Sequence, residues 1–215
     1  MTIRAKICGL STPETVTAAV DAGASHVGFV FFAKSPRNIS PEQLAELCKD
    51  IPSSVVKTGV FVNPEDSQLD RILTVAPLDL LQLHGSESPA RVQEIKTRFK
   101  RPVMKAIAVS GSDDMVRAKA YESSADMLLF DAKAPTELTD ALPGGNGLAF
   151  DWQIIQAAEI NLPWMLSGGL NMDNIADAIA ISGAQMIDVS SGVESRPGLK
   201  DSAKIKAFMS KVNSL

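Results

Sequence analysis

Cysteine and histidine are scarce in this chain, and their scarcity excludes several kinds of site. The 215 residues include two cysteines, Cys8 and Cys48, and two histidines, His26 and His84. Two isolated cysteines make no disulfide framework, which is typical of a protein of the reducing cytosol. No His/Cys group has the spacing of zinc ligands, so we expect no metal site.

Long apolar runs and basic clusters are also missing. No apolar run approaches the ~18 residues of a membrane span, and the start of the chain, 1–5, lacks the apolar region of a signal peptide. The formal net charge is −4 and no Lys/Arg cluster stands out. We therefore expect a cytoplasmic protein with neither a membrane nor a nucleic acid as partner.

Short apolar runs alternate with longer segments of helical period along the whole chain. Eight such units favour a closed (β/α)8 TIM barrel of the α/β class, one domain over residues 1–215, because an open doubly wound sheet rarely keeps eight uninterrupted units. The predicted strands end near Cys8, Val30, Val62, His84, Ala108, Asp131, Ser167 and Ser190.

Four predicted helix starts carry the same signal. In each, a residue able to cap a helix precedes a proline suited to the first turn. These pairs are Thr12-Pro13, Ser40-Pro41, Asn63-Pro64 and Ser88-Pro89.

Two connections are longer than the rest, and in both the excess follows a strand. One is 31–39, after the second strand, and the other is 132–149, after the sixth, with four residues at 144–147 that include three glycines. Both extensions are thus predicted on the face that carries catalysis in such barrels. They are either loops that close over substrate or surface insertions.

The last two strands run into small residues just before a helix. Ser167 is followed by Gly168 and Gly169, and Ser190 by Ser191-Gly192. Backbone N–H groups at such junctions bind phosphate, and the loops after the last two strands hold it in many (β/α)8 barrels. Each motif alone is more often an ordinary turn, but the pair predicts a phosphate site.

Two polar residues stand at the ends of otherwise apolar strands. Cys8 precedes Gly9, and Asp131 ends the strand 127–131. Alternation directs Asp131 into the barrel mouth, where an acid is costly unless it is used or paired. Helix N-termini around the mouth are expected to favour the Cys8 thiolate. We interpret both as catalytic; an inert thiol and a loop-capping carboxylate are the alternatives, and Cys48 is interpreted as packing.

Alternation also predicts an ion pair inside the barrel. Lys6 lies two residues before Cys8, and Asp188 two before Ser190, on strands that become neighbours when the barrel closes. Because a lone buried ammonium is heavily penalised, we expect a Lys6–Asp188 pair beneath the substrate that favours the Cys8 thiolate. Lys105 is a possible third member. A bulge that turns Lys6 to solvent is the alternative.

Six short motifs lie at these strand ends and in the second long loop: Lys6-Ile7-Cys8-Gly9, Gln82-Leu83-His84-Gly85, Phe130-Asp131, Gly147 through Phe150-Asp151-Trp152, Ser167-Gly168-Gly169-Leu170 and Asp188-Val189-Ser190-Ser191-Gly192-Val193-Glu194. In type and order they resemble the phosphoribosylanthranilate isomerase family of tryptophan biosynthesis. The resemblance covers essentially the whole chain, and no motif position departs from the family pattern.

The resemblance implies an Amadori rearrangement of N-(5-phosphoribosyl)anthranilate to 1-(o-carboxyphenylamino)-1-deoxyribulose 5-phosphate. It implies Asp131 as acid and Cys8 as base, with no metal or cofactor, since one acid and one base suffice. Arg37 matches the residue expected at the anthranilate end; an idle exposed loop arginine is the alternative. His84 and Asp188 are further candidates for contact with the substrate.

Competing readings keep the fold and change the function. The sugar-phosphate isomerase of histidine biosynthesis and the α-subunit of tryptophan synthase share the barrel, and Cys8 argues against both. A non-catalytic sugar-phosphate-binding barrel would have no need of Cys8 together with Asp131. The expected partner is a small phosphorylated sugar–anthranilate substrate, and the expected assembly is a monomer or a weak homodimer.

Overall fold

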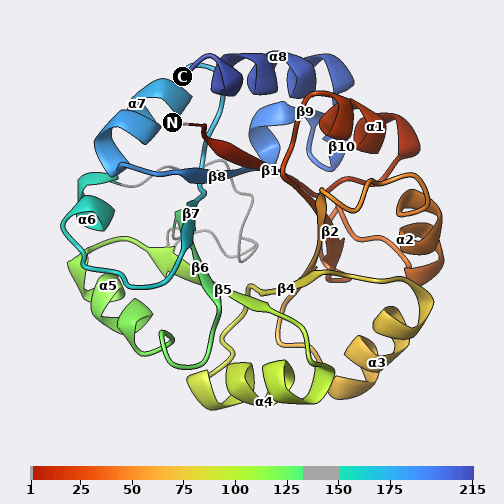
Figure 1. Ribbon diagram of the computed structural model, residues 1–215, viewed down its shortest axis with the longest axis horizontal. Coiled ribbons are helices and arrows are strands. Elements are labelled where there is room, and N and C mark those ends of the chain that lie inside the picture. The colour runs from red at the N-terminus through yellow and green to blue at the C-terminus, as the bar shows by residue number, and fades with distance from the viewer. Residues whose placement is uncertain (1, 133–150) are drawn as a thin grey trace.

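The computed structural model describes residues 2–132 and 151–215 of the chain. Eight parallel strands follow one another around a closed barrel, and β8 pairs with β1 to complete it. Figure 1 looks down this barrel, with a ring of helices outside the strands. The predicted (β/α)8 barrel is therefore confirmed, with strand ends within a residue or two of those predicted. The strands are β1 (Arg4–Cys8), β2 (His26–Phe31), β3 (Val56–Phe61), β4 (Leu80–Leu83), β5 (Val103–Val109), β6 (Met127–Ala132), β7 (Trp164–Leu166) and β8 (Met186–Val189).

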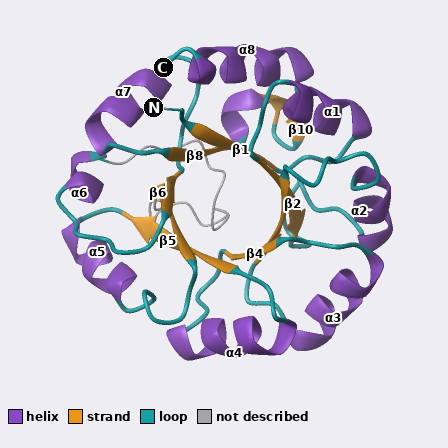
Figure 2. Cartoon of the chain, in the orientation of Figure 1, coloured by secondary structure: helices purple, strands orange, loops and turns teal. Residues whose placement is uncertain are grey.

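The helices cover the outer face of the barrel (Figure 2). A 3-10 turn and a two-stranded hairpin between β8 and the last helix are additions to the basic repeat. No helix in the described ranges is long and apolar enough to cross a bilayer. The elements are α1 (Pro13–Asp21), α2 (Pro41–Leu47), α3 (Asp66–Val75), α4 (Pro89–Phe99), α5 (Ser112–Lys119), α6 (Gln153–Gln156), α7 (Ile175–Ser182), η1 (Ser191–Val193), β9 (Glu194–Arg196), β10 (Leu199–Lys200) and α8 (Ser202–Asn213).

Three of the four predicted helix starts are confirmed. Thr12, Ser40 and Ser88 each accept a hydrogen bond from a backbone N–H of the first turn, and Ser40 does so in a capping box. The start at Asn63 is wrong, because α3 begins at Asp66. Asn63 instead adopts a left-handed φ of 46° and its Oδ1 accepts hydrogen bonds from the Ser86 backbone and hydroxyl. Its side chain therefore ties two loops together.

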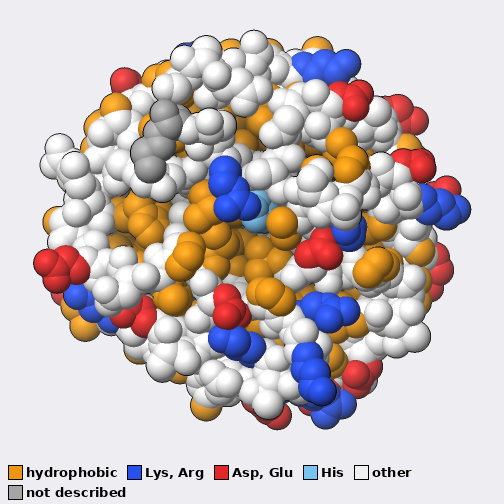
Figure 3. All heavy atoms as spheres, in the orientation of Figure 1, with side chains coloured by type: hydrophobic (Ala, Val, Ile, Leu, Met, Phe, Trp, Pro, Cys, Tyr) orange, Lys and Arg blue, Asp and Glu red, His pale blue; other side chains and the backbone are white. Residues whose placement is uncertain are grey.

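The barrel interior is layered. Its lower part is apolar, filled by Leu80, Met104, Ala106, Leu129, Met165 and Met186. Hydrophobic side chains also fill the centre of the face shown in Figure 3, so the ring of strands encloses packed side chains. Above the apolar layer lie polar groups, including Lys6 and Asp188, and Cys8 packs with Val30 and Val60 nearer the mouth. A buried charged pair thus lies between two apolar layers of the barrel.

The extension after β2 lies where it was predicted, at the carboxyl end of that strand. Its residue Asn38 bridges back to Val30, and it carries Arg37, which is buried. The extension 132–149, with the glycines at 144–147, lies outside the described residues apart from Ala132.

Candidate active site

Cys8 is the final residue of β1 and is 7% exposed. The chain turns sharply after it, because Gly9 has a φ of 80° and the N–H groups of Gly9 and Leu10 both donate to the Gly28 carbonyl, at 2.8 and 3.0 Å. A Cβ on Gly9 would lie 2.6 Å from the Arg37 Cδ. Gly9 is therefore needed both for the turn and for the close approach of Arg37 to Cys8's strand.

Asp131 points into the barrel mouth from β6, as strand alternation predicts, and is 4% exposed. Its Oδ1 accepts from the Ala132 N–H at 3.0 Å, and its Oδ2 lies 3.2 Å from the His84 Nε2. The His84 Nδ1 lies 2.8 Å from the Gln82 Nε2. If that amide donates, Nδ1 is the acceptor and the His84 Nε2–H donates to Asp131. His84 thus orients the candidate acid, and a contact between His84 and substrate stays a prediction.

The predicted ion pair inside the barrel is confirmed. The Lys6 Nζ lies 2.9 Å from the Asp188 Oδ1, and the two side chains are 0% and 5% exposed. Burial would lower the Lys6 pKa, but Asp188, with Cys8, raises it above its ordinary value. Lys6 is thus held as an ammonium below the mouth. Asp188 is buried in this pair, and its contact with substrate also stays a prediction.

The expectation that the surroundings as a whole favour the Cys8 thiolate is wrong, although Lys6 acts in the predicted direction. Burial raises the Cys8 pKa, and the Asp188 carboxylate adds to the rise; Lys6 lowers the pKa but does not overcome them. The prediction counted the favourable positive groups and omitted the cost of burying a thiolate.

Lys105 is not a third member of that ion pair. On β5 it pairs in register with Leu83 and lies between Met104 and Ala106, which face the barrel interior, so it points outward to the helix layer. Its Nζ lies 2.8 Å from the Glu87 Oε2, with both side chains 2% exposed. Burial lowers the Lys105 pKa, and Glu87 opposes the change.

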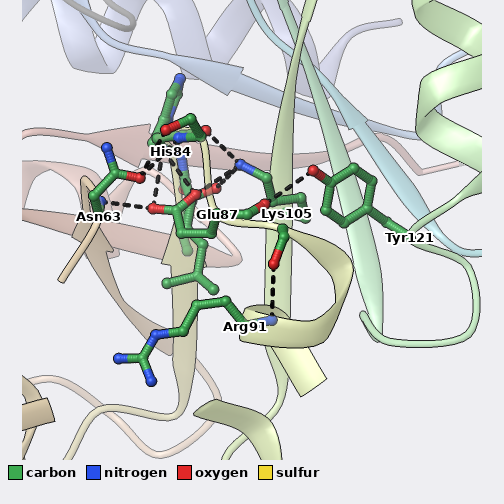
Figure 4. A network of polar contacts seen from close by, with 11 residues as sticks. Asn63, His84, Glu87, Arg91, Lys105 and Tyr121 are labelled. Carbon is green, nitrogen blue, oxygen red and sulfur yellow. Dashed lines mark hydrogen bonds and ion pairs between the residues drawn. The ribbon is translucent and has the colours of Figure 1, made fainter. Parts of the chain in front are cut away.

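The surroundings of Lys105 form a network that fixes the loop between β4 and α4 (Figure 4). The Lys105 Nζ also donates to the carbonyls of Leu83 and Gly85, at 3.2 and 2.7 Å. Glu87 accepts from the backbone N–H groups of Asn63 and Gly85. These bonds hold both sides of His84, which lies between Leu83 and Gly85. The sequence analysis missed this network, although Lys105 in an apolar strand signalled a buried partner.

Arg37 is buried and not the exposed loop arginine of the alternative reading. Its Nε lies 2.7 Å from the Glu194 Oε1 and its Nη2 2.9 Å from the Glu194 Oε2, a two-point pair. The Lys200 ammonium donates to the same carboxylate and, at 2.9 and 3.0 Å, to the carbonyl and hydroxyl of Ser190. The Ser190 hydroxyl in turn donates to the Cys8 carbonyl at 3.1 Å. The hairpin therefore connects Arg37, the end of β8 and the end of β1.

The charges of this second network support one another. Burial would raise the Glu194 pKa, but the hydrogen bond from Arg37 and the charge of Lys200 lower it below its ordinary value. Burial lowers the Lys200 pKa, while Glu194 works against that change. Glu194 is the last residue of the motif 188–194. Its partner Lys200 was not predicted, because nothing in the sequence signalled it.

The two predicted phosphate turns lie against each other. Gly168 and Gly169 have φ values of 91° and 62°, so both adopt the left-handed backbone. A Cβ on Gly168 would lie 2.5 Å from the Ala132 N, and one on Gly192 would lie 2.1 Å from the Leu170 carbonyl oxygen. The first turn therefore touches the strand of Asp131, and the second touches the first. Such close backbone packing leaves room for no side chain at either position.

Side-chain amides hold the first of these turns in place. The Gly169 carbonyl accepts hydrogen bonds from the side-chain amides of Asn174 and Asn171, at 2.9 and 3.3 Å. The Asn171 Oδ1 also accepts from the N–H groups of Asp173 and Asn174. These hydrogen bonds fix the Gly169 carbonyl, and Gly192 of the second turn packs against Leu170, the next residue of the first.

Metal ligands do not gather around the mouth. Within residues 2–132 and 151–215, no three or more His, Cys, Asp or Glu side chains lie close enough together to hold a metal ion. The fold and the site define the class: a (β/α)8-barrel protein with a thiol, a carboxylate and two glycine turns at the carboxyl ends of its strands.

Comparison with known proteins identifies the family. The family described as N-(5'phosphoribosyl)anthranilate (PRA) isomerase matches residues 5–211. The N-(5'-phosphoribosyl)anthranilate isomerase of Parvibaculum lavamentivorans is 51% identical over 209 residues, covering 97% of each chain. That of Paracoccus denitrificans is 51% identical over 211 residues, covering 98% of this chain and 97% of its own.

Solved structures give the same result. The phosphoribosyl anthranilate isomerase of Thermotoga maritima superposes with a TM-score of 0.88 at 37% identity, over the full length of both chains. Another phosphoribosyl anthranilate isomerase, solved with reduced 1-(o-carboxyphenylamino)-1-deoxyribulose 5-phosphate, gives a TM-score of 0.85 at 35% identity, again over both full chains. The chain belongs to the PRA isomerase family, and it is an isomerase of tryptophan biosynthesis.

Proposed function

We propose that Cys8 and Asp131 are the base and the acid of the Amadori rearrangement that converts N-(5-phosphoribosyl)anthranilate to 1-(o-carboxyphenylamino)-1-deoxyribulose 5-phosphate. The observation that carries this assignment is the placement of one thiol and one carboxylate at inward-facing strand ends of the same mouth. A proton donor and a proton acceptor are what the rearrangement needs.

The reaction divides into two proton transfers. Asp131 in its protonated form gives its proton to the ring oxygen, the ring C1–O bond breaks, and the aniline nitrogen stabilises C1 as an iminium. The Cys8 thiolate then takes the proton from C2. The electron pair of the broken C2–H bond forms a C1–C2 double bond and neutralises the iminium. The resulting enol becomes the ketone of the product by proton transfer from oxygen to C1.

His84 has a supporting part in this scheme. Its ring lies 3.2 Å from the Asp131 Oδ2 and is itself held by Gln82 at 2.8 Å. The Lys105–Glu87 network fixes the backbone on both sides of the ring. His84 therefore keeps the Asp131 carboxyl in one orientation toward the oxygen of the substrate's sugar ring. A positioned acid is more effective than a freely rotating one.

Arg37 and the glycine turns are proposed to bind the two ends of the substrate. A guanidinium suits the carboxylate or the aromatic ring of the anthranilate, and the Arg37 stem packs directly against Gly9, next to Cys8. Backbone N–H groups of Gly168, Gly169, Ser191 and Gly192 are proposed to hold the phosphate. The reacting C1 and C2 atoms would then lie between the two ends, in the mouth.

A direct assay tests the proposed activity. Purified protein is mixed with N-(5-phosphoribosyl)anthranilate, and the anthranilate-type fluorescence is followed over time. An isomerase removes the fluorescence with turnover, whereas a binding protein leaves it unchanged after a stoichiometric step. Inorganic phosphate is expected to compete with the substrate for the glycine turns.

The assembly and the compartment belong to the proposal as well. Large hydrophobic side chains that are exposed in the described ranges stand on separate elements: Val75, Val116, Ile181, Leu199 and Leu215. Because these exposed side chains are scattered over the described part of the chain, we expect a monomer or a weak homodimer, and sedimentation velocity measures it. Both cysteines are free thiols, which suits the cytoplasm.

A further inference from the structure

Three groups that can carry charge meet inside the barrel below its mouth. The Lys6 Nζ lies 2.9 Å from the Asp188 Oδ1. At Gly28 on β2, an added Cβ would lie 3.0 Å from both the Cys8 Sγ and the Lys6 Nζ. The sulfur and the ammonium therefore border the same small gap, which exists because residue 28 has no side chain.

The net charge of this cluster depends on whether Cys8 is a thiol or a thiolate. With Cys8 as a thiol, the ammonium of Lys6 and the carboxylate of Asp188 sum to zero, whereas a thiolate leaves one net negative charge in a buried place. Burial penalises such a net charge, in agreement with the raised Cys8 pKa. Lys200, from β10, also acts on Cys8 and lowers its pKa.

We propose that Lys6 is a positioning residue that stabilises the sulfur anion of Cys8 during proton abstraction, and that Asp188 holds Lys6 in place while limiting that stabilisation. The proposal rests on the base role proposed for Cys8 above. It assigns the two members of one ion pair opposite effects on the same thiol.

Removal of Lys6 and removal of Asp188 are therefore expected to change the Cys8 pKa in opposite directions. In Lys6→Met, a thiolate would face the Asp188 carboxylate with no cation between them, so the Cys8 pKa rises by about one unit or more. In Asp188→Asn, the thiolate becomes the counter-ion of Lys6 and the cluster is neutral with Cys8 ionised. The thiol is intrinsically the more acidic group of the two, so the Cys8 pKa falls.

The experiment titrates Cys8 without substrate. Ultraviolet absorbance of the thiolate is followed against pH in a Cys48→Ser background, with Cys8→Ser in the same background subtracted to remove the signal of Tyr121. Absorbance is preferable to alkylation because Cys8 is buried, so reagent access would enter the rate. Circular dichroism establishes that each variant is folded.

The expected order of the Cys8 pKa is Lys6→Met highest, Asp188→Asn lowest, and the unsubstituted protein between them. Lys6→Met leaves a carboxylate buried and unpaired, so its folding is a concern. The double variant Lys6→Met/Asp188→Asn has no unpaired charge, and its Cys8 pKa must lie above that of Asp188→Asn. Shifts of the same sign in the single variants, or a double variant equal to Asp188→Asn, overturn the proposal.

Kinetics give a second readout. In the active enzyme, Lys6→Met should move the rise of kcat/KM with pH to higher pH, and it should lower kcat far more than it changes KM. Because the titration needs no turnover, the two proposals fail separately. An inactive parent protein with the expected order of pKa values overturns the proposed function alone, whereas an active enzyme with the wrong order overturns the role of Lys6.

Discussion

Two buried lysines lie on opposite sides of the same sheet, and they are used differently. Lys6 faces the barrel interior and has Asp188 as its carboxylate partner, with the Cys8 thiol beside it. Lys105 faces the helix layer and binds Glu87 and two carbonyls. Burial is nearly complete for both, yet the Lys6 pKa is raised and the Lys105 pKa lowered.

The difference shows that burial and pairing do not by themselves assign a function. Lys6 has a titratable neighbour, Cys8, at the end of β1, so its charge is proposed to act on the protonation of that thiol. Lys105 donates hydrogen bonds to backbone carbonyls on both sides of His84, so it fixes the position of the loop that carries His84. The first lysine is expected to affect the protonation of the base, and the second the placement of the acid's partner.

The roles of both lysines depend on Cys8 and Asp131 being the base and the acid. Cys8→Ala and Asp131→Asn are each expected to lower kcat by about 10²-fold or more, a usual contribution of a general acid or base. Steady-state fluorescence kinetics measure it, with Cys48→Ala as the matched control. Turnover near that of the parent protein in either variant contradicts the assignment.

Removing Lys105 is expected to have its largest effect on stability. Lys105→Met leaves Glu87 buried without its cation, which costs about 3–5 kcal/mol for a buried pair, measured by urea unfolding. The control Lys105→Met/Glu87→Gln removes both charges and should recover a good part of the loss. The Cys8 pKa should be unchanged in both variants. A rise in the Cys8 pKa like that expected in Lys6→Met would contradict the different roles of the two lysines.

His26 on β2 is a buried titratable side chain in register with Lys6 on β1, and it differs from both lysines because it is held neutral near pH 7. Burial lowers the His26 pKa to about 4, and the charges of Arg4 and Lys6 add to the effect. Because this folded-state pKa lies below the unfolded value, the unfolded chain binds more protons at intermediate pH. His26 thus contributes stability above about pH 6.5 that is lost as pH falls toward about 4, up to about 3 kcal/mol.

Urea unfolding between pH 7 and pH 4 measures this contribution of His26, with the range set by that pKa. In His26→Gln the free energy of unfolding should fall less over this range than in the parent protein. Equal slopes for the two proteins would mean that His26 is as easily protonated in the folded state as in the unfolded chain.

The smallest expected effect concerns the phosphate turns. Gly192→Ala places a Cβ 2.1 Å from the Leu170 carbonyl oxygen, so the two turns must separate and the anion site widens. We expect KM to rise about tenfold, equivalent to about 1.4 kcal/mol of binding, with a smaller change in kcat. Gly111→Ala is the control, because an added Cβ there meets nothing within 4 Å. An unchanged KM would remove this turn from the site.

Strand periodicity predicted where the strands end and which side chains face the barrel interior. The ends of β1 and β6 placed Cys8 and Asp131 at the mouth, and alternation from Cys8 and Ser190 placed Lys6 opposite Asp188, 182 positions away. The same alternation, counted from the inward-facing Ala108, turns Lys105 outward. Lys105 is therefore excluded from the interior pair, in agreement with its register with Leu83.

Other features depend on distant contacts or on balances that no local pattern contains. Arg37 and Glu194 are 157 positions apart, and Lys200 reaches the same carboxylate from a hairpin that the eightfold repeat does not include. The direction of the Cys8 pKa is a difference between burial, Lys6 and Asp188, so it requires the geometry of all three. Asn63 precedes a proline like the true caps, but its left-handed backbone places its side chain in a loop contact.

The most direct test of the account is the effect of deuterium at sugar C2 on single-turnover rates in Lys6→Met and Lys105→Met. If Cys8 removes the C2 proton with help from Lys6, that transfer limits the rate in Lys6→Met, and deuterium should slow this variant by a primary isotope effect. In Lys105→Met the isotope effect should equal that of the parent enzyme. Equal isotope effects in the two lysine variants, or none in Lys6→Met, would contradict the assignment of the base and its cation.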